Sequence, residues 1–130
     1  IRLSRSLGKK SKMISTTRPT FGVRYCYPPS IENWIRYIAG AKFVITDSFH
    51  GLAFSLIYNK QFVVISPSNG KNSRLKDLLK SVGLEDRYFD ENDPIIYREL
   101  QNKKIDYNKV NSKLEILKKV SWDYLKNALQ

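Results

Sequence analysis

The sequence predicts an α/β fold, a Rossmann-like parallel sheet flanked by helices. Two short apolar runs, Phe43–Thr46 and Phe62–Ile65, have the form of strands that are buried on both faces. Amphipathic helix patterns stand before, between and after these runs. Because such alternation is typical of a parallel sheet with helical crossovers, we expect a core of helix, strand, helix, strand and helix over residues 30–84.

Residues 1–29 read as a basic lead-in of strand and loop. Ile1–Leu7 resembles the end of a helix, Lys12–Ser15 a short strand, and Thr16–Pro29 a loop that Pro28 and Pro29 keep irregular. The chain opens inside this helix pattern and without a methionine. This start predicts that the sequence is part of a longer polypeptide.

The first complete helix pattern begins at Ser30, a good N-cap residue, and ends at Gly40. Its apolar residues recur at helical spacing and form one stripe: Ile31, Trp34, Ile35, Ile38 and Ala39. After the first strand, Asp47–Gly51 is expected to be a turn. Leu52–Tyr58 is then a second helix, closed by Asn59.

Ser73 is predicted to cap the third helix of the core, which ends before Gly83. Its apolar side consists of Leu75, Leu78, Leu79 and Val82. The stretch Glu85–Pro94 is rich in turn residues and acids. A last helix is expected over residues 107–129, lying across the domain with a solvated outer face; its apolar face would carry Val110, Leu114, Leu117, Ser121, Tyr124 and Ala128.

Length and composition predict one globular domain over residues 1–130. The chain is 42% hydrophobic and 27% charged, which excludes wholesale disorder. Cys26 is the only cysteine, so an intrachain disulfide and a cysteine-based metal site are excluded and no metal site is predicted. No apolar run reaches the roughly 20 residues that span a bilayer. We therefore expect a cytoplasmic location.

The charge predicts an anionic partner. The formal net charge is +11, and the excess of Lys and Arg lies entirely in residues 1–82, because residues 83–130 hold nine cations and nine acids. Nucleic acid, a phosphate-bearing metabolite, an acidic polymer or a membrane surface would each suit a basic front half. Nucleic acid is the least favoured of these, since no known nucleic-acid-binding motif is present.

Two loops at the predicted carboxyl ends of the strands hold the candidate site residues, because ligands bind at that edge of open α/β sheets. In the first loop, His50 stands at the mouth of a helix, where it could donate or accept a proton. Gly51 would let a ligand approach the backbone. Ser48 is either a ligand or a plain helix cap. His50 is either functional or a helix-capping or core histidine.

The second loop, residues 66–74, combines hydroxyls and cations. Arg74 stands in the first turn of a helix, where the helix dipole disfavours a cation unless an anion binds there. A guanidinium with free helix N–H groups can hold a carboxylate or phosphate, with Lys71 as a second cation. A solvated surface arginine is the other interpretation. Ser66 and Ser73 complete the candidate binding residues.

The strand-to-helix string Thr46-Asp47-Ser48-Phe49-His50-Gly51, with Ser73-Arg74-Leu75 and Leu78-Leu79 downstream, resembles the polysaccharide pyruvyl transferase family. The resemblance runs from about Ser30 to Arg87. It implies a two-domain architecture resembling GT-B glycosyltransferases, of which this chain would cover most of the C-terminal, Rossmann-like half. The N-terminal domain of the same enzyme would then help to form the acceptor cleft.

Members of this family transfer the enolpyruvyl carbons of phosphoenolpyruvate to two hydroxyls of a sugar, in a surface polysaccharide or its lipid-linked precursor. The resemblance therefore implies phosphoenolpyruvate as donor substrate without a separate cofactor, a sugar or lipid-linked oligosaccharide as acceptor, and work in bacterial capsule or exopolysaccharide assembly. A peripheral contact with the inner face of the membrane would accompany a lipid-linked acceptor.

Position by position, His50 matches the active-site histidine of the family, and Arg74 falls where related members place a cation that holds the donor. Some members carry an arginine two positions before the histidine, where this chain has Ser48. Lys71 or a residue of the other half could replace that arginine.

Two other functions remain open at the level of sequence. One is a GT-B-like glycosyltransferase domain that uses a nucleotide sugar, which would need a nucleobase pocket. The other is a noncatalytic fragment or interaction module.

Overall fold

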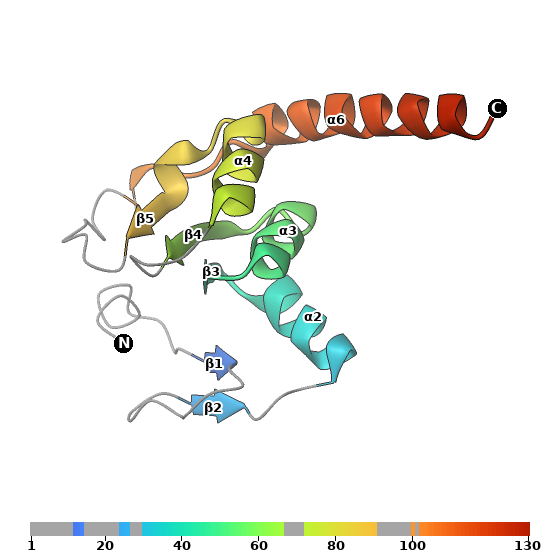
Figure 1. The fold of residues 1–130 in the computed structure, drawn as a ribbon. Coiled ribbons are helices and arrows are strands. Elements are labelled where there is room, and N and C mark those ends of the chain that lie inside the picture. The colour runs from blue at the N-terminus through green and yellow to red at the C-terminus, as the bar shows by residue number, and fades with distance from the viewer. Residues whose placement is uncertain (1–11, 15–23, 27–29, 67–71, 91–99, 101) are drawn as a thin grey trace.

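A computed structural model describes residues 12–14, 24–26, 30–66, 72–90, 100 and 102–130. Its central sheet has three parallel strands in the order β3-β4-β5, formed by Phe43–Thr46, Gln61–Ser66 and Tyr88–Asp90. Along the chain, helices α2 (Ile31–Gly40), α3 (Phe49–Ile57) and α4 (Ser73–Val82) alternate with the strands (Figure 1). This alternation confirms the α/β, Rossmann-like class expected from the sequence.

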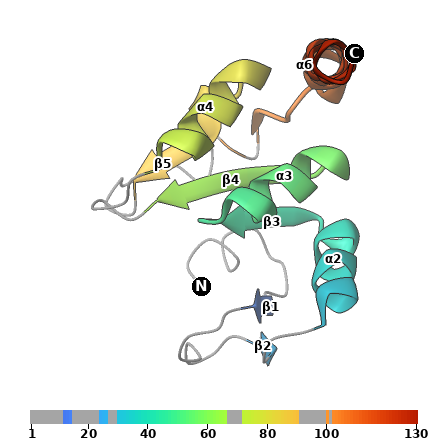
Figure 2. The same cartoon turned by 45° about the vertical axis from the view of Figure 1, so that its right-hand side comes forward.

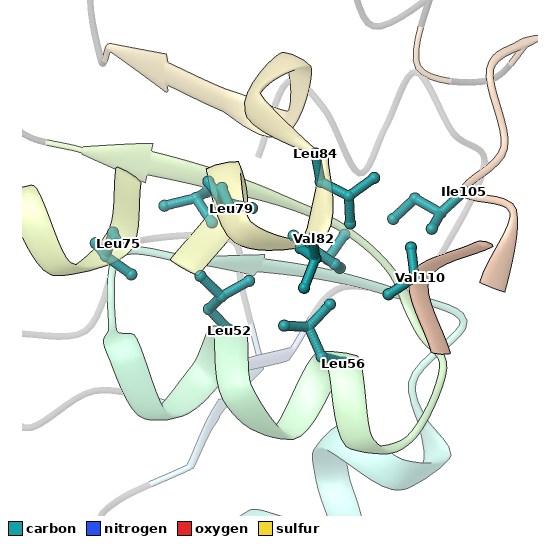
Figure 3. Close-up of a cluster of buried hydrophobic side chains, with 10 residues drawn as sticks. Leu52, Leu56, Leu75, Leu79, Val82, Leu84, Ile105 and Val110 are labelled. Carbon is teal, nitrogen blue, oxygen red and sulfur yellow. The ribbon is translucent and has the colours of Figure 1, made fainter. Parts of the chain in front are cut away.

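Helices α3 and α4 share one hydrophobic core with strand β4. Leu52 and Leu56 of α3 point toward Leu79 and Val82 of α4 (Figure 3). Phe62 and Val64 of β4 belong to the same cluster and are fully buried. Since both helices pack on this core, their first turns are held at fixed positions relative to the strands.

Helix α2 begins and ends where the sequence predicts. The Ser30 hydroxyl accepts a hydrogen bond from the backbone N–H of Asn33 at 3.4 Å, and the helix ends at Gly40. Trp34 packs edge-on against Phe54 of α3, with ring centroids 5.4 Å apart. The predicted apolar stripe is only partly covered, because Ile31 at its start is 76% exposed.

Strand β3 corrects the expectation that both apolar runs are buried on two faces. Phe62, Val63 and Val64 of β4 are buried, as predicted. In β3, however, Ile45 is 47% exposed, while Val44 packs against the core. Because β3 is the first strand of the sheet order and only one of its faces meets the core, alternate side chains remain open.

Helix α3 begins three residues earlier than predicted, at Phe49 rather than Leu52. Ser48 is its N-cap, so Phe49, His50 and Gly51 form the first turn. The predicted turn therefore shrinks to two residues between β3 and α3. At the other end Asn59 takes a left-handed conformation, with φ of 52°, which ends the helix close to the predicted position.

Helix α4 corrects the predicted cap. Asn72, not Ser73, occupies the N-cap position, and Ser73 is the first helical residue. Gly83 ends the helix in the left-handed conformation, with φ of 71°, as its place in the sequence predicts.

Two strands lie where the sequence predicts loop or turn. In the first, β2 (Arg24–Cys26) pairs in parallel with β1 (Lys12–Ile14) inside the expected loop. In the second, the short helix η1 (Glu85–Arg87) and strand β5 occupy the start of the expected turn-rich stretch. The expected helix end at 1–7 lies outside the described residues.

The last helix, α6 (Tyr107–Ala128), has nearly the predicted length but does not lie across the domain. Val110 is buried and Leu114 packs against the core. Beyond them the helix extends away from the other elements (Figure 1), and Trp122 and Tyr124 are 63% and 73% exposed. The predicted apolar face is therefore covered only in its first two turns.

Candidate active site

The two candidate loops lie at one edge of the sheet. Strands β3 and β4 are parallel neighbours, with Thr46 paired to Val64. Helix α3 follows the carboxyl end of β3, and α4 follows that of β4. The strand ends and the starts of both helices lie at the same end of the fold (Figure 2). Helix N-termini carry unpaired N–H groups and positive dipole ends, so this edge favours an anion.

The connection between β3 and α3 is held by its own side chains. The Thr46 hydroxyl accepts a hydrogen bond from the Ser48 N–H at 3.1 Å. The Ser48 hydroxyl in turn accepts from the Gly51 N–H at 3.5 Å, and the Ser48 carbonyl accepts from the Leu52 N–H at 3.0 Å. Ser48 therefore acts as the helix cap and is itself half-buried.

Gly51 is required by close packing inside the fold. A Cβ at this position would lie 2.2 Å from Thr46 Oγ1 and 2.9 Å from Thr46 Cβ. Gly51 is buried, and the Thr46 side chain fills the space beside its Cα. Packing against Thr46 thus explains why glycine stands at this position, in addition to the ligand approach expected from the sequence.

His50 is exposed in the first turn of α3. Its ring meets the Phe49 ring at an interplanar angle of 87°, with centroids 6.1 Å apart. The side chain is thus free to reach a ligand at the helix start while Phe49 limits where the imidazole can lie.

Arg74 is exposed in the first turn of α4. No carboxylate of the described residues forms an ion pair with it; the ion pairs there involve Lys103, Lys109 and Lys118. An unpaired guanidinium at the positive end of a helix dipole favours binding of an anionic group.

The start of α4 lacks a side-chain cap. Asn72 makes no capping hydrogen bond; its side-chain NH2 group donates to the hydroxyl of buried Ser66. Ser66 therefore fastens the cap residue to the end of β4. Ser73 is exposed beside the free N–H groups of this first turn. Lys71, the second predicted cation, lies outside the described residues.

Phe49 brings the two halves of the site together. The guanidinium carbon of Arg74 lies 5.9 Å from the centre of the Phe49 ring, within the range of a cation–π interaction. The same ring contacts His50. One aromatic side chain thus contacts both the histidine of α3 and the arginine of α4. The sequence pattern does not distinguish Phe49 as a site residue, because an aromatic residue beside a strand end usually indicates core packing.

The described residues hold no group of three or more His, Cys, Asp or Glu side chains that could bind a metal ion. Within the same part of the chain, no helix combines the length and apolarity needed to cross a membrane.

Comparison with protein families identifies a match over residues 7–69 to the family described as polysaccharide pyruvyl transferase. The matched region includes β3, α3 and His50 and ends before Arg74. No curated protein matches the chain, and no solved structure does.

Proposed function

We propose, on the basis of the match over residues 7–69, that the chain is a polysaccharide pyruvyl transferase. Its site would bind phosphoenolpyruvate and transfer the pyruvyl carbons to a sugar. The family implies a pyruvyl donor and a sugar acceptor. The observation that carries the proposal is the Arg74–Phe49–His50 arrangement, which joins a cation, a proton carrier and two helix N-termini at one edge.

Phosphoenolpyruvate carries a phosphate and a carboxylate, and the site offers a separate means of holding each. Arg74 can bind one group through charge-assisted hydrogen bonds. The uncapped first turn of α4 and the first N–H groups of α3 can bind the other. In this assignment Ser48 and Gly51 shape the start of α3, Ser66 and Ser73 belong to the α4 side, and Lys71 supplies a further cation.

His50 is proposed to deliver the proton that starts the reaction. Protonation of the methylene carbon of phosphoenolpyruvate turns it into a methyl group and makes C2 electrophilic. One sugar hydroxyl then attacks C2, a second hydroxyl closes the ketal, and the bond between C2 and the phosphate oxygen breaks. Of the two hydroxyl protons released, one balances the proton placed on the methyl group and the other leaves with the phosphate. An exposed imidazole, whose ring nitrogens can donate or accept a proton, suits such a proton transfer.

The architecture around the site is proposed from the same family. We place residues 1–130 in the C-terminal half of a GT-B-like enzyme, whose N-terminal domain completes the acceptor cleft. A sugar or lipid-linked oligosaccharide of a bacterial surface polysaccharide would be the acceptor, and the reaction would occur in the cytoplasm at the inner face of the membrane. The exposed positions of His50 and Arg74 support a site that a second surface closes.

Calorimetric titration of the chain with phosphoenolpyruvate tests the donor assignment. We expect saturable binding that Arg74→Gln weakens at least about tenfold, because losing a charge-assisted hydrogen bond costs about 1.5–3 kcal/mol. Lys80→Gln is the matched control, since Lys80 is an exposed cation in the last turn of the same helix. Binding of a nucleotide sugar in place of phosphoenolpyruvate would instead support the glycosyltransferase function.

A further inference from the structure

Arg87 is a buried cation outside the candidate active site. It ends η1 and directly precedes β5, so it lies at the amino end of a parallel strand. His50 and Arg74 follow the carboxyl ends of β3 and β4. Only 1% of the Arg87 surface is exposed, which is unusual for arginine outside an ion pair.

The hydrogen-bond partners of this guanidinium are incomplete. Arg87 Nη2 donates to the backbone carbonyl of Lys103. Nε and Nη1 are buried and have no hydrogen-bond partner among the described residues. Together these two nitrogens carry three N–H donors. Burial without acceptors penalises each donor and penalises the positive charge still more.

The neighbouring carboxylate forms its ion pair with another cation. Asp86 Oδ2 lies 2.6 Å from the ammonium of Lys103 and forms an ion pair with it. Burial lowers the pKa of the Arg87 guanidinium, although the negative charge of Asp86 opposes this effect. The site therefore contains a buried positive charge without a paired anion of its own.

A cavity of about 1000 Å³ lies beside this guanidinium. It is open to solvent and is lined by the end of α4, by η1 and by the start of α6. Its basic lining residues are Arg87, Lys103, Lys104, Lys109 and Lys113.

The acidic lining residues are fewer: Glu85, Asp86 and Asp106. Asp86 and Asp106 are paired with Lys103 and Lys109, at 2.6 and 3.9 Å. The cations that remain without a carboxylate among the described residues are Lys104, Lys113 and the buried Arg87. The lining thus has an excess of positive charge around a guanidinium with unused donors.

We propose that this cavity is an anion-binding site for a phosphate group, in which Arg87 supplies buried N–H donors and Lys104 and Lys113 supply charge. A phosphate has enough oxygen acceptors for several donors at once and a charge that matches the local excess. The site is separate from the proposed donor site and does not depend on the pyruvyl transferase assignment, because none of the residues that line it belongs to the start of α3 or α4.

The Nε–Hε signals of arginine in a ¹⁵N-labelled full chain give a direct test. Sodium phosphate is titrated against sodium chloride at matched ionic strength, and Arg87→Lys identifies the Arg87 signal. Should that variant fail to fold, the signal is assigned by triple-resonance spectra of the unaltered chain. We expect a saturable shift of the Arg87 signal with phosphate and none with chloride.

Three variants and a second ligand complete the experiment. Lys104→Gln should weaken phosphate binding at least threefold. Lys80→Gln and Arg74→Gln, which both lie outside the cavity, should leave the Arg87 response unchanged. Glycerol 2-phosphate distinguishes the source: equal binding indicates the phosphate group of a larger molecule, and binding of orthophosphate alone indicates the free ion. An Arg87 signal that does not respond, or responds equally in Lys104→Gln, would overturn the proposal.

Discussion

Arg74 of α4 lies over the ring of Phe49 in α3, with 5.9 Å between the guanidinium carbon and the ring centre. The two residues are 25 positions apart in the sequence and belong to helices that follow neighbouring strands. Their contact joins the start of the histidine-bearing helix to the start of the arginine-bearing helix, and it orients the cation of the proposed donor site.

This contact predicts an indirect effect of Phe49 on the donor. Phe49→Leu should weaken phosphoenolpyruvate binding about two- to fivefold, because an exposed cation–π interaction contributes about 0.5–1 kcal/mol. Calorimetry measures the effect in the native and Arg74→Gln backgrounds. If Phe49 acts by positioning Arg74, the substitution changes nothing in the second background. An equal loss in both backgrounds would mean that Phe49 acts by another route.

Substitutions at Ser48 can separate its role as helix cap from the effect of local charge on donor binding. Ser48→Asp should preserve the melting temperature, since aspartate caps helices as well as serine and suits the helix dipole. The added negative charge beside His50 should nevertheless weaken phosphoenolpyruvate binding at least about tenfold, because it repels the anionic donor. Ser48→Asn is the neutral control and should retain both properties. Tight binding of phosphoenolpyruvate to Ser48→Asp would mean that the donor does not bind at the start of α3.

Alanine substitutions at Gly51 and Gly40 should differ in their effect on the free energy of unfolding. Gly51→Ala places a methyl group 2.2 Å from Thr46 Oγ1, whereas a methyl group at Gly40 meets nothing within 4 Å. Overpacking typically costs about 1–3 kcal/mol, so Gly51→Ala should lower the free energy of unfolding by that amount. Gly40→Ala should change it by less than about 1 kcal/mol. Urea denaturation gives both values, and equal effects would contradict the packing described for Thr46.

Tyr107 predicts a pH dependence of stability. Its hydroxyl donates to the backbone carbonyl of Lys60, and the Ser55 carbonyl lies 3.3 Å away. Burial raises the pKa of this phenol, while the positive charge of Arg87 opposes the rise. Because the folded-state pKa exceeds the unfolded one, the unfolded chain loses the proton first. The stabilisation is complete below about pH 10 and declines as the pH rises toward the folded-state pKa.

Tyr107→Phe should therefore be less stable than the native chain by about 1–2 kcal/mol at neutral pH, the contribution of a part-buried hydrogen bond. This difference should narrow above about pH 10. Tyr124→Phe serves as control, because Tyr124 is 73% exposed and its substitution should have the same small effect at every pH. A difference for Tyr107→Phe that stayed constant or widened in alkali would rule out the proposed titration.

Much of the fold was predictable because its main elements carry strong local signals. The apolar runs of β3 and β4 and the helical spacing in α4 and α6 identify these elements without tertiary information. Strands β2 and β5 were missed because each has only three residues and includes polar side chains, too few for a period to emerge. Their pairing depends on neighbours that are distant in the sequence.

The start of α3 shows why local signals also mislead. Gly51 suggests a turn, yet Ser48 caps the helix, and the Thr46 side chain leaves room only for glycine in the first turn. His50 and Arg74 were identifiable from their places at strand ends. The role of Phe49 between them depends on the order of the sheet, and the burial of Arg87 depends on the start of α6; neither leaves a pattern within its own segment.

The most direct test of the proposed function uses the fact that the chain has a single histidine. In a chain labelled with ¹³C at histidine Cε1, the one imidazole signal reports on His50 alone while phosphoenolpyruvate is titrated in. We predict a saturable shift of this signal with phosphoenolpyruvate, displaced to at least about tenfold higher concentration by Arg74→Gln. A His50 signal that does not shift with phosphoenolpyruvate but shifts with a nucleotide sugar would contradict the assignment of phosphoenolpyruvate as the donor.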